Sequence, residues 1–136
     1  ATEGYKVAEV LAEKQVPCVV GPLLMGRSKA ELQEVNIRNA ALLAEAGVKI
    51  AIQTDATSET RWLPIEVGVA VREGLPEEEG FRAVTINAAA IIGLEDRLGS
   101  IEPGKDADLA LFDGHPFETR SRCRMVLIDG EIVHST

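Results

Sequence analysis

The stretch Gly93–Asp113, GLEDRLGSIEPGKDADLALFD, decides the fold prediction. Gly93 closes a helix, a glycine and proline turn follows, and the chain then enters a short apolar strand. The later stretch Val126–Ser135, VLIDGEIVHS, carries the Asp129-Gly130 pair that is typical of a two-residue β-hairpin turn. Short antiparallel strands are therefore expected over residues 95–136, at Leu109–Phe112, Arg124–Ile128 and Glu131–His134.

The pattern before Gly93 is different, because amphipathic segments alternate with short apolar runs. This alternation predicts an α/β fold with parallel strands. The run Val16–Gly21 is almost wholly apolar and favours a strand buried on both faces. The strands at Pro17–Gly21 and Lys49–Gln53 are predicted to be parallel neighbours. Helices are expected at Lys6–Lys14, Ser28–Ala46 (with Ser28 and Glu31 as a capping box), Leu63–Glu73 and Pro76–Ile92.

Composition excludes some partners. The 136 residues carry a net charge of −8, which disfavours nucleic acid and anionic membrane surfaces because both repel an acidic protein. No apolar run approaches the ~20 residues that a membrane span requires. Cys18 and Cys123 stand in unrelated contexts, so we expect two reduced thiols and a cytoplasmic protein.

Asp55 is the outstanding candidate for chemistry. It follows the apolar strand Val48–Ile52 within the polar run Gln53–Thr60. Ligands of parallel α/β folds gather at the C-terminal ends of the strands, here after Val48–Ile52 and at Gly21–Gly26. A carboxylate at such a position can bind a divalent metal or accept a proton from an attacking water. The alternative is that Asp55 caps a turn or the next helix.

The remaining candidates have weaker support. Trp62 and Arg61 follow the Asp55 loop, and Trp62 is either a packing anchor or a substrate contact. His115 and His134 do not stand at metal-ligand spacing from another ligand residue and are predicted to be turn or surface residues. Asp106 and Asp108 would either form a small carboxylate site or, as we expect, shape the turn before Leu109, so substrate-binding residues stay unassigned.

The stretch Ile92–Leu109 resembles the C-terminal segment of the metal-dependent amidohydrolase superfamily, in its imidazolonepropionase-related subgroup. Residues 63–90 resemble the last barrel helices of the subgroup, and Gln53-Thr54-Asp55 resembles the end of the eighth strand. The resemblance implies a (β/α)₈ TIM-type barrel with one or two divalent metals, often zinc, and a small β-sandwich built from both chain ends. Residues 1–94 would be the last part of the barrel, and residues 95–136 the C-terminal strands of the sandwich.

The resemblance also implies a role for Asp55. The eighth-strand aspartate of the superfamily ligates metal and passes a proton from the attacking water to the leaving group. The other ligands of the superfamily are histidines on the first, fifth and sixth strands and a lysine or glutamate on the fourth, all upstream of this chain. This chain alone is therefore expected to be inactive and to bind no metal. Ala56 stands where close relatives are expected to have a histidine, which leaves the substrate contacts open.

Two functions remain in competition. In the first, the chain is the C-terminal portion of a hydrolase that cleaves a C–N bond of a small-molecule substrate, in a cyclic amide or an amide-linked amino acid. In the second, it is a non-enzymatic module that binds itself or a partner. Under both, the rest of a parent chain or another copy is expected to cover the open sheet edges.

Overall fold

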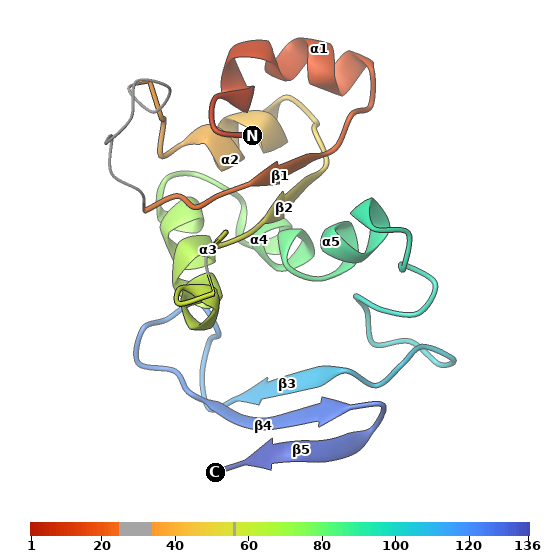
Figure 1. Ribbon diagram of the computed structural model, residues 1–136. Coiled ribbons are helices and arrows are strands. Elements are labelled where there is room, and N and C mark those ends of the chain that lie inside the picture. The colour runs from red at the N-terminus through yellow and green to blue at the C-terminus, as the bar shows by residue number, and fades with distance from the viewer. Residues whose placement is uncertain (25–33, 56) are drawn as a thin grey trace.

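The computed structural model describes residues 1–24, 34–55 and 57–136 (Figure 1). A parallel strand pair lies between helices in the upper part of the view, and an antiparallel sheet forms a separate layer below. The N-terminal half contains η1 (Gly4–Val7), α1 (Ala8–Glu13), β1 (Cys18–Val20), α2 (Asn39–Glu45) and β2 (Ile50–Ile52). The C-terminal half contains η3 (Thr60–Trp62), α3 (Leu63–Arg72), α4 (Glu77–Ala83), α5 (Ile86–Ile91), β3 (Leu109–Phe112), β4 (Cys123–Ile128) and β5 (Glu131–Ser135).

The parallel pairing of β1 and β2 confirms the predicted strand neighbours. Cys18 is opposite Ile50 and Val20 is opposite Ile52. The helices α2, α3, α4 and α5 all contact β2, which is why every residue of β2 is buried. The largest fully buried side chains lie in this region and are Val20, Leu43, Ile50, Val67 and Leu75.

In this chain β1 is buried on one face only, whereas its apolar sequence predicts a strand that is buried on both faces. Cys18 and Val20 are buried, but Val19 between them is 37% exposed. In the described part of the chain only β2 pairs with β1, and the residue paired with Val19, Ala51, is buried, so exposure on this face is confined to the β1 side. An apolar run indicates a strand that is buried on both faces only when elements pack on both of those faces.

The helix predicted over residues 28–46 begins later in the described residues. Ser28 and Glu31, the predicted capping box, lie outside them. Residues 34–38 form turns and irregular backbone, and α2 begins at Asn39. Asn39 is buried because its amide contacts the N-terminal segment: its Oδ1 accepts from the Tyr5 amide at 2.8 Å, and its Nδ2 donates to the Ala1 carbonyl at 2.6 Å.

The single helix predicted from Pro76 to Ile92 is two helices, α4 and α5. The break falls at Thr85, whose backbone is far from helical (φ −131°, ψ −102°). The Thr85 hydroxyl donates to the Phe81 carbonyl at 2.7 Å. The β-branched residues Val84, Thr85 and Ile86 weaken the helix at this point. The break also lets the buried Asn87 donate from Nδ2 to the Ile50 carbonyl at 3.1 Å.

The C-terminal sheet confirms the three predicted strands to within a residue. Its order is β3-β4-β5, with antiparallel pairs such as Leu109 with Leu127 and Ile128 with Glu131. Asp129 and Gly130 both have positive φ (52° and 79°), as a tight hairpin turn requires. The Asp108 carboxylate accepts a hydrogen bond from the Asp129 amide at 2.9 Å, which ties the turn to β3.

The segment between α5 and β3 is a polar scaffold. Arg97 pairs with Asp106 at 2.5 Å, and the Arg97 carbonyl accepts from the Asp106 amide at 2.9 Å. The Lys105 ammonium donates to the Glu95 carbonyl at 2.5 Å and to the Ser100 hydroxyl at 2.6 Å. Asp106 and Asp108 therefore shape this segment through hydrogen bonds, in agreement with their predicted role as turn formers.

Glycines allow the C-terminal segment to approach the helices. A Cβ on Gly68 of α3 would lie 2.7 Å from the Phe117 carbonyl oxygen, and one on Gly99 would lie 2.7 Å from the Ile86 Cα.

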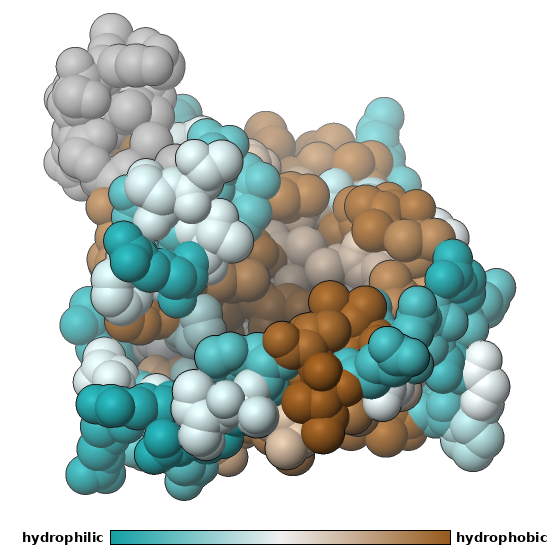
Figure 2. Space-filling view, turned by 60° about the horizontal axis from the view of Figure 1, so that its bottom comes forward, coloured by the Kyte–Doolittle hydropathy of each residue, from teal (hydrophilic) through white to brown (hydrophobic). Residues whose placement is uncertain are grey.

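A cavity of about 520 Å³ lies between the helices α3 and α4 and the strand β3. Its lining is mostly apolar and includes Val67, Phe81 and Phe112. Hydrophobic residues surround a hollow in the face drawn in Figure 2. Within the described residues, helices long and apolar enough to cross a membrane are absent.

Candidate functional site

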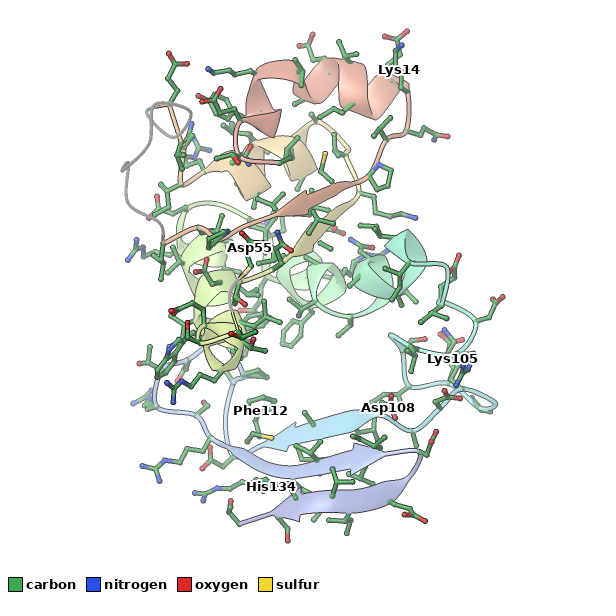
Figure 3. The ribbon with its side chains drawn as sticks, in the orientation of Figure 1. Lys14, Asp55, Lys105, Asp108, Phe112 and His134 are labelled. Atoms are coloured by element: carbon green, nitrogen blue, oxygen red, sulfur yellow. The ribbon has the colours of Figure 1, made fainter. Side chains whose placement is uncertain are left out.

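Asp55 lies beyond the C-terminal end of β2, as predicted. The strand ends at Ile52, and Figure 3 shows Asp55 where the chain leaves β2 toward α3. Its backbone has φ +62°, in the left-handed region that Asp tolerates better than most residues. Asp55 is exposed to solvent.

An open cavity of about 530 Å³ adjoins Asp55. Three chain segments contribute to its wall: the loop after β1, the loop after β2, and the η3–α3 segment. The lining residues are Pro22, Leu24, Thr54, Asp55, Glu59, Trp62, Ile65 and Glu66. One part of the wall is thus apolar, and another carries carboxylates. The cavity lies at the strand end where ligands of parallel α/β folds gather.

The loop after β1 is held against the loop after β2. The Gln53 amide donates to the Val20 carbonyl at 2.9 Å and extends the strand pairing beyond β2. Gly21 has φ +131° and would bring a Cβ to 1.9 Å from the Gln53 carbonyl oxygen. Only glycine therefore fits at this position, and the two loops that line the cavity start from a fixed contact.

Glu66 is a polar residue of the site that the sequence analysis missed. It lies in α3 and is only 5% exposed, and its Oε2 accepts a hydrogen bond from the Leu23 amide at 2.6 Å. One signal was present in the sequence, since Glu66 is the acidic residue inside the apolar stretch Leu63–Val71. A charged residue in a buried helix needs a specific partner.

Trp62 belongs to the cavity wall. Its side chain is 46% exposed. The Arg61 guanidinium lies 5.3 Å from the ring centroid of Trp62 in a cation–π arrangement. Trp62 and Asp55 line the same cavity.

The histidines and cysteines lie elsewhere. His115 packs between Phe81 and Phe117, with ring centroids 5.4 Å and 5.3 Å away, and its Nε2 lies 3.4 Å from a Glu77 carboxylate oxygen. His134 lies on the exposed strand β5. Both cysteines are among the described residues and are free thiols.

The candidate site offers one side chain, Asp55, that is suited to bind a metal ion. A carboxylate such as Asp55 is a common ligand of divalent metals, and its exposure leaves the oxygens accessible. The described part of the chain holds no group of three or more His, Cys, Asp or Glu side chains that could bind a metal ion. Any metal at Asp55 would therefore need ligands beyond these residues.

Comparison with known proteins identifies the class. The sequence profile of the amidohydrolase family matches residues 6–134. An amidohydrolase of Thermotoga maritima MSB8 superposes with a TM-score of 0.95 and 46% identity, over 99% of this chain and 36% of that one. A Xaa-Pro dipeptidase with bound methionine superposes with a TM-score of 0.64 and 29% identity, over 97% of this chain and 33% of that one. These neighbours show that the fold is part of a TIM-type barrel with an attached sheet.

An imidazolonepropionase of Shouchella clausii (strain KSM-K16) is 44% identical over 85 residues, which is 60% of this chain and 19% of that protein. The chain thus spans about a fifth of this relative. The chain belongs to the amidohydrolase family, and its relatives include imidazolonepropionases.

Proposed function

We propose that this chain is the C-terminal part of a metal-dependent hydrolase that cleaves a C–N bond, in which Asp55 is both a metal ligand and the group that moves the proton. The observation that supports this most is the place of Asp55 beyond the buried strand β2 and on the wall of the 530 Å³ cavity. Residues 1–94 would contribute to the barrel, and residues 95–136 to the sandwich.

The metal, which we propose to be zinc, would supply an activated water and polarise the scissile carbonyl. Asp55 would hold one position of the metal through a carboxylate oxygen. It would also accept the proton of the attacking water and deliver it to the leaving nitrogen. Its backbone lies in the left-handed region at φ +62°, and Asp55 is part of the cavity wall.

The wall of the cavity suggests where the substrate lies. Trp62, Leu24 and Ile65 offer apolar surface beside the Asp55 carboxylate. A substrate whose amide group adjoins a ring or an apolar side chain would fit here. Its carbonyl would lie near Asp55, and its apolar part would lie on this surface. The names of the relatives support two substrate classes, a cyclic amide and an amide-linked amino acid.

The other candidate is a non-enzymatic module that binds through its open sheet edges. Exposed apolar residues of β5, Ile132 at 59% and Val133 at 56%, favour contact with further protein. The same residues are equally suited to contact the rest of a longer amidohydrolase, about two thirds of which is absent from this chain when measured against the Thermotoga maritima protein. We therefore prefer the hydrolase.

The test is made on the full-length parent protein. Metal analysis of the purified protein and a hydrolysis screen over cyclic amides and dipeptides are the measurements. We expect at least one equivalent of divalent metal and turnover of one substrate class. A metal-free, well-folded parent with no hydrolysis across the panel would favour the binding module.

A further inference from the structure

Glu66 is a buried carboxylate that has no role in the proposed chemistry. It lies in α3 at 5% exposure, and a carboxylate so far from water is stable only with strong hydrogen bonds. The structure shows one with the Leu23 amide, where Oε2 lies 2.6 Å from the nitrogen. A hydrogen bond between a carboxylate and a backbone amide is charge-assisted and among the stronger kinds in proteins.

This bond joins two walls of the Asp55 cavity. Leu23 belongs to the loop after β1 and is 7% exposed, and its neighbours Pro22 and Leu24 line the cavity. Glu66 belongs to α3, which follows directly on the segment that carries Trp62. The backbone of the β1 loop is therefore fixed to α3 through one side chain.

A second contact completes the frame. The Gln53 amide donates to the Val20 carbonyl at 2.9 Å, which holds the start of the β1 loop against the β2 loop, and at Gly21 the backbones lie so close that a Cβ would stand 1.9 Å from the Gln53 carbonyl oxygen. The β2 loop carries Asp55. All three segments of the cavity wall are thus connected by hydrogen bonds, from Gln53 to Val20 and from Leu23 to Glu66.

We infer that Glu66 is a positioning residue of the Asp55 site: its bond to the Leu23 amide holds the apolar wall of Leu24 and Trp62 at a fixed distance from the Asp55 carboxylate. The inference rests on the proposed function of Asp55. Glu66 acts through the Leu23 backbone and not on the reacting atoms. Small shifts of a substrate-binding wall have large effects, since ~1 Å of misplacement can cost about 10²-fold in rate.

Three substitutions of Glu66 in the full-length enzyme separate the effect of its side-chain length from the effect of its charge. Glu66→Gln keeps the length of the side chain and an oxygen that can accept the Leu23 N–H. Glu66→Asp keeps the charge but is one methylene too short. Glu66→Ala removes both. If the bond positions the wall, kcat/KM should fall by about tenfold to a hundredfold in the Ala and Asp variants and by less than about tenfold in the Gln variant.

Glu78→Ala is the matched control, because Glu78 is an exposed glutamate in the first turn of α4. It should leave kcat/KM unchanged. An Asp variant that is more active than the Gln variant would show that the charge of Glu66 matters and its reach does not, and it would overturn the inference. Activity equal to that of the unchanged enzyme in all three variants would do the same.

Amide hydrogen exchange provides a readout that does not depend on turnover. Exchange at the Leu23 amide should accelerate in the Ala and Asp variants, while amides of β2 keep their protection. A uniform loss of protection through β1, β2 and α3 would show that Glu66 only stabilises the fold, and would contradict a positioning role. If the Ala variant does not fold, the comparison of Gln with Asp decides.

The two proposals fail in different ways. If Asp55→Asn retains turnover, the proposed role of Asp55 is wrong, and the positioning role falls with it even where Leu23 exchange accelerates. If Asp55→Asn is inactive while Glu66→Ala is fully active, only the positioning role is wrong. Slow turnover in both, with local exchange at Leu23, supports both.

Discussion

Gly21 lies against the Gln53 carbonyl oxygen so closely that a Cβ on Gly21 would stand 1.9 Å from that oxygen. The contact joins the ends of the two parallel strands beside the candidate site. Gly21 also has φ +131°, which side-chain-bearing residues avoid. Gly21→Ala should therefore destabilise the protein by about 2–4 kcal/mol, measured as the free energy of unfolding in urea.

Gly47 provides the control for that change. It has φ +85°, but a Cβ there would meet nothing within 4 Å. Gly47→Ala should cost only the backbone strain, about 1–2 kcal/mol. Equal costs at both positions would mean that the contact with Gln53 does not constrain the loops.

Lys105 holds the segment between α5 and β3. Its side chain is 12% exposed, and it donates to the Glu95 carbonyl and the Ser100 hydroxyl. Lys105→Met removes these donors while keeping the apolar stem, so unfolding should become easier by about 1–3 kcal/mol. The exposed Lys14 is the control (Figure 3), and Lys14→Met should change stability by less than about 0.5 kcal/mol. Similar effects of the two substitutions would argue against a scaffold role for Lys105.

Asp113 should make stability depend on acid pH. Its Oδ1 accepts the Arg122 amide at 2.8 Å, and its Oδ2 lies 2.7 Å from the Arg124 guanidinium. The Arg122 amide first, and Arg124 after it, hold the pKa of Asp113 below its usual value. A lowered pKa stabilises the fold above the unfolded-state pKa of about 3.9, and this contribution is lost as pH falls through the folded-state pKa.

Asp113→Asn tests this pH dependence. The difference in unfolding free energy between the unchanged protein and the variant should be constant near neutral pH and should shrink as pH falls below about 4. The midpoint of urea unfolding, followed at several pH values, measures it. A difference that grows toward low pH would mean that the sign of the pKa shift is wrong.

The isolated 136-residue chain should associate. The strand β1 exposes Val19 at 37%, and β5 exposes Ile132 at 59% and Val133 at 56%. Uncovered strands with apolar faces drive self-association. Sedimentation of the isolated chain should show oligomers or aggregates, and Ile132→Lys with Val133→Lys should reduce them. A cooperatively melting monomer would contradict this prediction.

Much of the fold was predictable because local patterns determine it. The β3–β5 strands and the Asp129-Gly130 turn follow from alternation and turn chemistry, and they agree with the structure to within a residue. The break at Thr85 has only a weak local signal, the β-branched run Val84–Ile86, and the hydrogen bond from Asn87 to the Ile50 carbonyl that accompanies it lies between residues far apart in the sequence.

The candidate site divides in the same way. The position of Asp55 could be predicted because it follows an apolar strand, and strand ends are where ligands of such folds gather. Glu66 could not, because its partner is a backbone amide 43 residues away in the sequence. The only sign of such a contact in the sequence is a charged residue within an otherwise apolar helix.

The role of Asp55 is tested most directly by the turnover of Asp55→Asn in the full-length enzyme, with its melting temperature measured on the same sample. The asparagine keeps the shape of the side chain but cannot accept the proton of the attacking water. We expect kcat to fall by about 10²–10⁴-fold, which is the typical contribution of a general base, while the melting temperature of the protein stays unchanged. Turnover close to that of the unchanged enzyme would remove Asp55 from the chemistry and contradict the account.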